Sequence, residues 1–226
     1  MIGGPLLEVS LTIVMAFHLL AMNVAMGGPL VCIWLEWRQS RRDDVAAGQL
    51  GRRLARDSIW LLVAGCVLGV LAGWLVWRMG DQSYFEALGR LPGKIFYGLW
   101  ELVFSFVCML VYVLWWKYSR RTGIVARICH RTLAVFAATN LMWHFPPLFA
   151  VISILADREP TGGEIDAAAF RPYMYSAEVL LRSAHVWIAS VAVSGVWLMG
   201  YTLRTLRAAC PDDGWADASR IAIGGA

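Results

Sequence analysis

The sequence predicts an all-α, polytopic membrane protein, and three observations carry that prediction. The 226 residues are 59% hydrophobic and only 16% charged, and their mean hydropathy is +0.58. The apolar residues gather into long blocks, each near or above the ~20 residues with which a helix crosses a bilayer. Because lipid offers the backbone no hydrogen-bond partners, blocks this long and unbroken are expected to be helices.

Five blocks qualify as membrane spans. They are Leu6–Leu35, Ile59–Trp77, Ile95–Trp116, Leu133–Leu155 and Ala177–Leu206. We expect four of these helices to form a bundle to which the fifth is added. Residues 1–208 would then be one membrane domain, and residues 209–226 a short cytoplasmic tail.

The orientation of the spans is predicted from the loops that hold the cations. Three segments hold most of the lysines and arginines. They follow the first span (Arg38, Arg41, Arg42, Arg52, Arg53 and Arg56), follow the third span (Lys117, Arg120, Arg121, Arg127 and Arg131), and lie near the end of the sequence (Arg204, Arg207 and Arg220). The positive-inside rule places these segments in the cytoplasm and the N-terminus outside. The net charge of +4 is therefore a topology signal, and we expect no nucleic-acid partner.

Small residues at four-residue spacing predict close helix packing. The second span carries Gly65, Gly69 and Gly73, and the fifth carries Ser190 and Ser194. Such faces let helix backbones approach one another where lipid supplies no hydrophobic driving force.

The connections between the spans are expected to differ on the two sides of the membrane. The inner segment Arg38–Arg56 is predicted to be amphipathic and to lie at the membrane interface. The outer segment Ala156–Ser176 is predicted to be an ordered surface loop that meets a partner. Tryptophans near the span ends are expected to form an aromatic belt.

Polar residues within the spans are the candidates for function, because intramembrane ionisable groups are costly and usually have partners. Four such residues lie at similar distances from the outer ends of their spans: His18 about 12 residues in, His144 about 11, His185 about 8 and Glu101 about 6. At about 1.5 Å per residue, these positions are roughly 18, 16, 12 and 9 Å deep. Three histidines and a carboxylate from four spans thus share one layer. His130, beside arginines near the inner surface, is expected to contact lipid headgroups.

The matched depth of the histidines favours a haem. One buried histidine alone would be interpreted as hydrogen-bonded to a carbonyl group. Imidazole is, however, a common ligand of haem iron, and the cores of helix bundles hold such cofactors. No C-x-x-C-H motif occurs, so a haem would be bound without thioether links. A zinc or copper site is less favoured, since Glu101 alone supplies little of the carboxylate or thiolate that a dehydrated dication needs.

Two neighbours of these histidines also fit a porphyrin. Met22 lies one turn below His18 on the same face, as packing or as a ligand. Arg182 lies three residues before His185, where it would pair with an outward-pointing propionate or extend to the membrane surface.

Four segments together resemble a known family. They read "FHLLAMNVAMGGPLVCIWLEW", "GCVLGVLAGW", "TNLMW" and "AHVWIASVAVSG". In order and spacing they resemble the N-terminal half of the large, haem-bearing subunit of cytochrome bd quinol oxidases, across all five spans. The resemblance implies that His18 is a haem ligand, that His185 ligates a low-spin haem, and that the protein resides in a bacterial inner membrane.

The chain also departs from that family. The family's protein continues with further spans, a quinol-binding loop, a methionine opposite the low-spin haem's histidine, and a glutamate ligand. Tyr97 and Ser105 stand where the family has two carboxylates, with Glu101 between them. His144 has no counterpart in the family, and it would complete a bis-histidine pair with either His185 or His18. Such a pair closes the iron to oxygen and suits electron transfer.

The expected function is that of an electron-transfer subunit. It would be a membrane b-type cytochrome with one or two haems, within a respiratory complex. Electrons would pass between the quinone pool and an outer redox subunit such as a c-type cytochrome. Two alternatives stay open. One is half of a split bd-like oxidase that reduces oxygen, and the other is a haem-free membrane anchor.

Overall fold

The computed structural model of the protein describes residues 4–119 and 123–209, and its side chains up to residue 116 and from 123 to 204. Helices are the only regular secondary structure among the described residues. In chain order the helices are α1 (Gly4–Arg42), α2 (Val45–Met79), α3 (Ser83–Gly89), α4 (Pro92–Ser119), α5 (Ile124–Arg158), α6 (Ala167–Met174) and α7 (Ala177–Ala209). The five long helices are apolar and long enough to cross a membrane, which confirms the predicted fold class. The predicted tail at residues 209–226 lies almost entirely outside the described residues.

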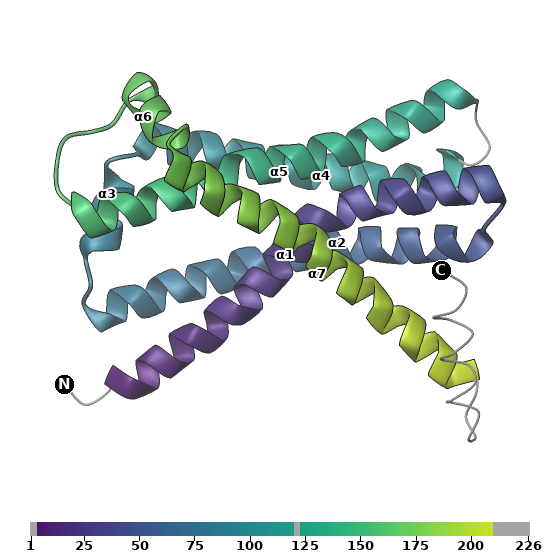
Figure 1. The fold of residues 1–226 in the computed structure, drawn as a ribbon, viewed down its shortest axis with the longest axis horizontal. Coiled ribbons are helices and arrows are strands. Elements are labelled where there is room, and N and C mark those ends of the chain that lie inside the picture. Colours follow the sequence, from purple (N-terminus) through teal and green to yellow (C-terminus); the bar gives the residue numbers. More distant parts are fainter. Residues whose placement is uncertain (1–3, 120–122, 210–226) are drawn as a thin grey trace.

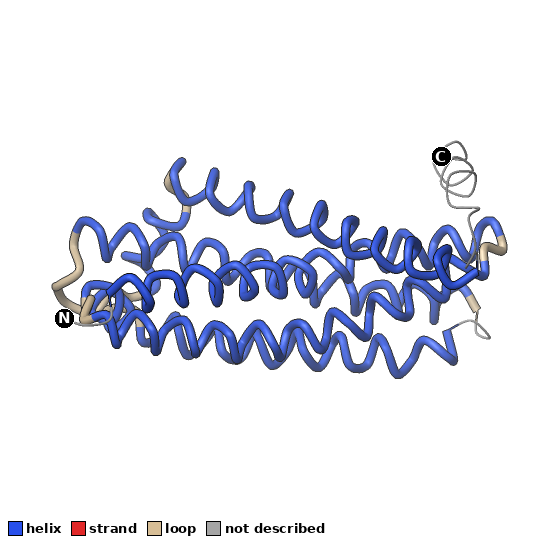
Figure 2. Tube along the Cα trace, turned by 90° about the horizontal axis from the view of Figure 1, so that it is seen from below, coloured by secondary structure: helices blue, strands red, loops and turns tan. Residues whose placement is uncertain are grey.

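The long helices run lengthwise through the molecule, with α7 oblique to the others (Figures 1 and 2). Helices α1 and α2 form an antiparallel hairpin with the most extensive contact of any pair, and α4 and α5 form a second hairpin. Helix α7 crosses over α1 in Figure 1 and also packs against α5. The short helices α3 and α6 lie at the end of the molecule that holds the N-terminus of α1. In the predicted topology this is the outer end.

Helices α1 and α7 cross where small residues allow their backbones to touch. A Cβ atom at Gly27 of α1 would clash with the backbone carbonyl of Ser190 and lie 2.8 Å from Oγ of Ser194. Gly28 faces α2 instead, where an added Cβ atom would clash with the side-chain hydroxyl of Ser58. The close packing predicted for Ser190 and Ser194 is confirmed, and its partner is Gly27 of α1.

The inner turn between α1 and α2 is much shorter than predicted. Both helices continue through Arg38–Arg56 and are joined by Asp43 and Asp44 alone, so the prediction of a long loop there is wrong, while its place at the membrane interface stays a prediction. Asp44 caps α2 by accepting a 2.9 Å hydrogen bond from the amide of Ala47, and Arg38 donates a 2.8 Å bond to the same carboxylate. The Ala47 amide first, and then Arg38, lower the pKa of Asp44. A charged N-cap thus fixes the turn.

The outer connection from residue 156 to 176 is ordered, as predicted. It contains α6, whose N-cap Asp166 accepts a hydrogen bond from Ala169. The amide of Ile165 donates a 2.7 Å bond to the carbonyl of Arg90, and the Arg90 guanidinium donates to the carbonyl of Gly163 at 3.1 Å. The connection therefore packs on the α3–α4 turn. The partner predicted for it stays a prediction.

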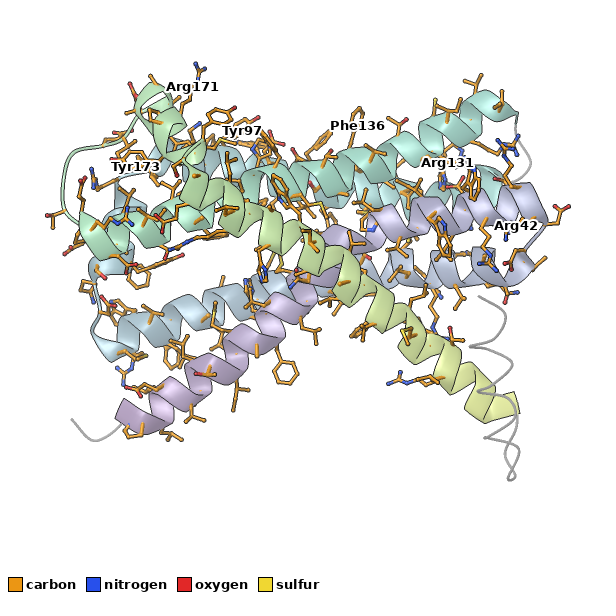
Figure 3. All side chains as sticks on the ribbon, in the orientation of Figure 1. Arg42, Tyr97, Arg131, Phe136, Arg171 and Tyr173 are labelled. Carbon is orange, nitrogen blue, oxygen red and sulfur yellow. The ribbon has the colours of Figure 1, made fainter. Side chains whose placement is uncertain are left out.

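The surface of the long helices is apolar along most of its length. Trp60, Trp74, Trp77, Trp100 and Trp143 are exposed, as are Leu181, Ile188 and Val196 of α7. Figure 3 shows charged and aromatic side chains at both ends, with Arg171 and Tyr173 at one end and Arg42 and Arg131 at the other. Such a surface indicates a lipid bilayer as its surroundings.

Candidate cofactor site

His18 lies at the contact between α1 and α2, and a hydrogen bond fixes its ring. Its Nδ1 is 2.8 Å from the backbone carbonyl oxygen of Gly65. A carbonyl group can only accept a hydrogen bond, so Nδ1 carries the proton in a neutral ring. The other nitrogen, Nε2, then holds a free lone pair, and it has no hydrogen-bond partner among the described residues. A carbonyl bond at one nitrogen that leaves the other free is the usual arrangement of a metal-ligating histidine.

Two glycines of α2 make room for His18 and Met22. A Cβ atom at Gly69 would lie 3.0 Å from Cε1 of His18, and one at Gly65 would lie 2.5 Å from Sδ of Met22. At the third glycine of the predicted face, Gly73, an added Cβ would have nothing within 4 Å. Two of the three glycines therefore receive side chains from α1, and the sulfur of Met22 is packed against the backbone of α2.

His144 lies in a different helix pair. Its ring meets that of Tyr97 of α4 edge-on, with the ring centroids 5.3 Å apart. The carboxylate of Glu101 lies close enough to Tyr97 and to His144 to interact electrostatically with both. Asn140 of α5 donates hydrogen bonds of 2.8 Å to the Glu101 carbonyl oxygen and 2.9 Å to Oγ of Ser105. These contacts tie α4 to α5 in the outer half of the molecule.

His185 lies on an exposed face of α7. Neither of its ring nitrogens has a hydrogen-bond partner among the described side chains. Arg182, one turn before it, donates a 2.7 Å bond to Glu178 and a 3.4 Å bond to Ser153. Glu178 also pairs with Arg158 at 3.0 Å. Arg182 therefore belongs to a surface ion-pair cluster in this structure, and its pairing with a propionate stays a prediction.

The predicted site residues share the outer half of the molecule but do not surround one point. His18 is held against α2, His144 against α4, and His185 faces outward from α7. The structure thus brings Tyr97, Glu101 and His144 together. It leaves His18 with its glycines apart from them, so neither proposed bis-histidine pair is assembled among these rings.

The residues around His18 fit a ligand of haem iron. The free Nε2 would supply the donor atom, and the bond to Gly65 fixes the ring beside Gly69. Two buried polar atoms of the outer half, Oδ1 of Asn23 and Oγ of Ser183, have no hydrogen-bond partner among the described residues. Buried polar groups are rarely left unpaired in native proteins, so each of these atoms is a position where a bound group would find a partner.

A second polar cluster lies near the inner end, and no pattern in the sequence indicates it. The ring of His130 is fully buried, so its predicted contact with lipid headgroups is wrong. Its Nδ1 is 3.0 Å from Oε2 of Glu36, and its Nε2 is 2.8 Å from the carbonyl oxygen of Tyr112. Arg131 lies 3.4 Å from the other oxygen of Glu36. Helix α5 begins at Ile124, about two turns before His130, which places the ring inside the bundle.

The contacts of His130 require a proton between two side chains. Because the carbonyl group of Tyr112 only accepts, Nε2 must carry a hydrogen. Nδ1 and the Glu36 carboxylate then share one proton, either as imidazolium and carboxylate or as imidazole and carboxylic acid. The Tyr112 ring stacks on the imidazole with the centroids 4.1 Å apart. A cavity of about 250 Å³, lined in part by Glu36, Asp43 and Arg127, adjoins the pair.

Comparisons with models of known families, with curated proteins and with solved structures find no match for this chain. The resemblance to the bd oxidases therefore rests on the four segments alone.

Proposed function

We propose that the protein is a membrane-bound b-type cytochrome subunit that carries electrons between the quinone pool and a redox partner on the outer side. The observation that carries the proposal is His18, whose Nδ1 is bound to the Gly65 carbonyl while Nε2 stays free. A haem held at Nε2 would lie in the outer half of the bundle. It would supply the one-electron chemistry, and the chain would supply the ligand, its orientation and an apolar shell.

Electron transfer is favoured over oxygen reduction because Glu101 has no second carboxylate near it on α4. Oxygen chemistry needs an open iron and a supply of protons. The family that the chain resembles has two carboxylates on this helix, and here Tyr97 and Ser105 take those positions. Ser105 is fully buried and accepts a hydrogen bond from Asn140. Glu101 is the single carboxylate in the sequence of α4.

A haem-free anchor subunit is the second candidate, and a specific observation favours it. The bond between His18 and Gly65 satisfies one polar atom of a half-buried histidine without any cofactor. Apolar side chains such as Leu6, Val9 and Phe17 are also exposed along the outer half of α1, and they would suit a neighbouring subunit as well as lipid. The two candidates differ in one visible property, because only the cytochrome is coloured.

The experiment for the proposal is anaerobic mixing of the purified protein with a short-chain quinol while the haem absorption is followed. We expect the haem to be reduced, and the His18→Gln variant to lose the haem or turn it high-spin. A haem that stays oxidised with every quinol tested would contradict electron exchange with the quinone pool. Binding of carbon monoxide to the reduced protein, with oxygen uptake, would favour the split oxidase instead.

A further inference from the structure

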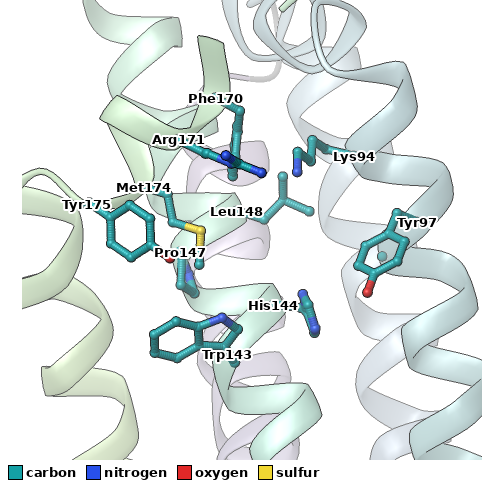
Figure 4. A pocket seen from close by; sticks show the side chains of 11 residues that line it. Lys94, Tyr97, Trp143, His144, Pro147, Leu148, Phe170, Arg171, Met174 and Tyr175 are labelled. Carbon is teal, nitrogen blue, oxygen red and sulfur yellow. The ribbon is translucent and has the colours of Figure 1, made fainter. Parts of the chain in front are cut away.

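A pocket of about 170 Å³ lies between α4, α5 and α6 at the outer end of the molecule (Figure 4). Lys94 and Arg171 line it, and Figure 4 shows the charged ends of these two side chains directed toward one another. His144 and Tyr97 lie below the two cations in the same view. The pocket is thus cationic at one end and aromatic at the other.

The two cations of the pocket have no acidic partner among the described residues. No aspartate or glutamate lines the pocket, and neither cation forms an ion pair with a described side chain. The ammonium group of Lys94 is held 4.8 Å above the ring centroid of Phe170, which is itself buried. Lys94 is half-buried and Arg171 is exposed, and two like charges that face each other repel less when an anion lies between them.

The walls of the pocket favour an amphiphilic anion over a soluble one. Trp143, Pro147, Leu148 and Met174 present apolar surface below the cations. Lys94 is the third residue of α4, and the exposed surface of that helix continues with Phe96, Leu99 and Trp100. A charged headgroup bound between the cations would therefore leave its acyl chains beside an apolar surface at membrane depth. Aromatic side chains at this level suit the interface between headgroups and hydrocarbon.

We propose that this pocket binds the phosphate group of an anionic phospholipid from the outer leaflet. Lys94 and Arg171 supply charge-assisted hydrogen bonds to the phosphate oxygens. The lipid would hold α6 against α4 and α5, because Arg171 is on α6 and Lys94 is on α4. This role does not depend on a haem or on electron transfer.

The test compares lipid binding by the full-length protein and a Lys94→Gln/Arg171→Gln double variant. Delipidated protein is returned to phosphatidylcholine vesicles with or without phosphatidylglycerol, and bound lipid and thermal unfolding are measured. We expect phosphatidylglycerol to co-purify with the wild-type protein and raise its unfolding temperature, and the double variant to lose both effects. Arg78→Gln is the matched control, since Arg78 is an exposed cation at the same end on α2, and it should behave as wild type.

Three results would overturn the proposal. One is equal phosphatidylglycerol binding and stabilisation in the wild-type protein and the double variant. A second is full stabilisation of the wild-type protein by inorganic phosphate alone, which would assign the pocket to a soluble anion. The third is loss of haem from the double variant with lipid binding unchanged, which would assign the cations to propionates. A cooperative unfolding transition in pure phosphatidylcholine verifies that the variants fold. The lipid test can be read in the same way if the protein contains no haem.

Discussion

The imidazole of His18 and the backbone carbonyl of Gly65 are joined by a 2.8 Å hydrogen bond between two antiparallel helices. This bond fixes the tautomer of the ring and leaves Nε2 as the free donor atom. The same helix places Gly69 under the ring, so the position of His18 depends on two glycines of α2 as well as on α1.

Alanine at Gly69 should disturb His18 directly. The added Cβ would lie 3.0 Å from Cε1 of the ring, a tight contact that the ring must relieve by moving. Overpacking of this kind costs ~1–3 kcal/mol, so we expect roughly tenfold weaker haem binding or an altered spectrum. The measurement is the haem-to-protein ratio of the purified variant. Gly73→Ala is the control, because its Cβ would meet nothing within 4 Å, and equal spectra for both variants would contradict this role of Gly69.

Alanine at Gly27 should loosen the crossing of α1 and α7. Its Cβ would clash with the Ser190 carbonyl, which belongs to a helix backbone and cannot move aside easily. We expect a loss of ~1–3 kcal/mol in the free energy of unfolding. Denaturation in detergent measures it, with Gly195→Ala on the open face of α7 for comparison. Equal stability of the two variants would show that the helices do not touch at Gly27.

Removal of Glu36 should destabilise the inner half of the bundle. Glu36→Ala leaves the buried His130 without its proton-sharing partner, and loss of one member of a buried pair costs ~3–5 kcal/mol. A double-mutant cycle with His130→Ala should show strong coupling in the unfolding free energy. Glu8→Ala, which removes an exposed carboxylate from the same helix, should change little. Additive effects of Glu36→Ala and His130→Ala would argue against the pairing.

The inner turn should lose stability in acid. The folded-state pKa of Asp44 is lowered, first by the Ala47 amide and then by Arg38, so its stabilising effect is complete above the unfolded pKa of about 3.9. That effect is lost as the pH falls through the lower folded-state pKa. The Asp44→Asn variant keeps a capping residue without the charge. Unfolding temperatures of the two proteins should therefore differ at neutral pH and converge in strong acid, and a constant difference would refute this.

The membrane spans can be predicted from the sequence because length and hydropathy determine them. Leu133–Leu155, for example, lies wholly within α5. The inner ends cannot be placed in the same way. The arginines of Arg38–Arg56 suggest a loop, although α1 and α2 continue through most of this segment. Cations and helix formers do not by themselves show where a helix stops, and the local signal for the turn is the Asp44 cap.

The candidate site could be predicted only in part. Depth along a helix follows from residue counting, but the direction of each side chain depends on helix rotation and on neighbours. His18 and His144 are at similar depth, yet they contact different helices. The prediction for His130 is wrong for a related reason, since its arginine neighbours are evident in the sequence and its partner Glu36, 94 residues away, is not.

The most direct test of the proposed cytochrome is a pyridine haemochrome assay with a reduced-minus-oxidised spectrum of the purified wild-type protein. We expect haem b at one or more per chain, with His18→Gln losing it or changing its spin state. A colourless wild-type protein that folds normally, or a His18→Gln spectrum identical to wild type, would contradict the assignment of His18 as a haem ligand.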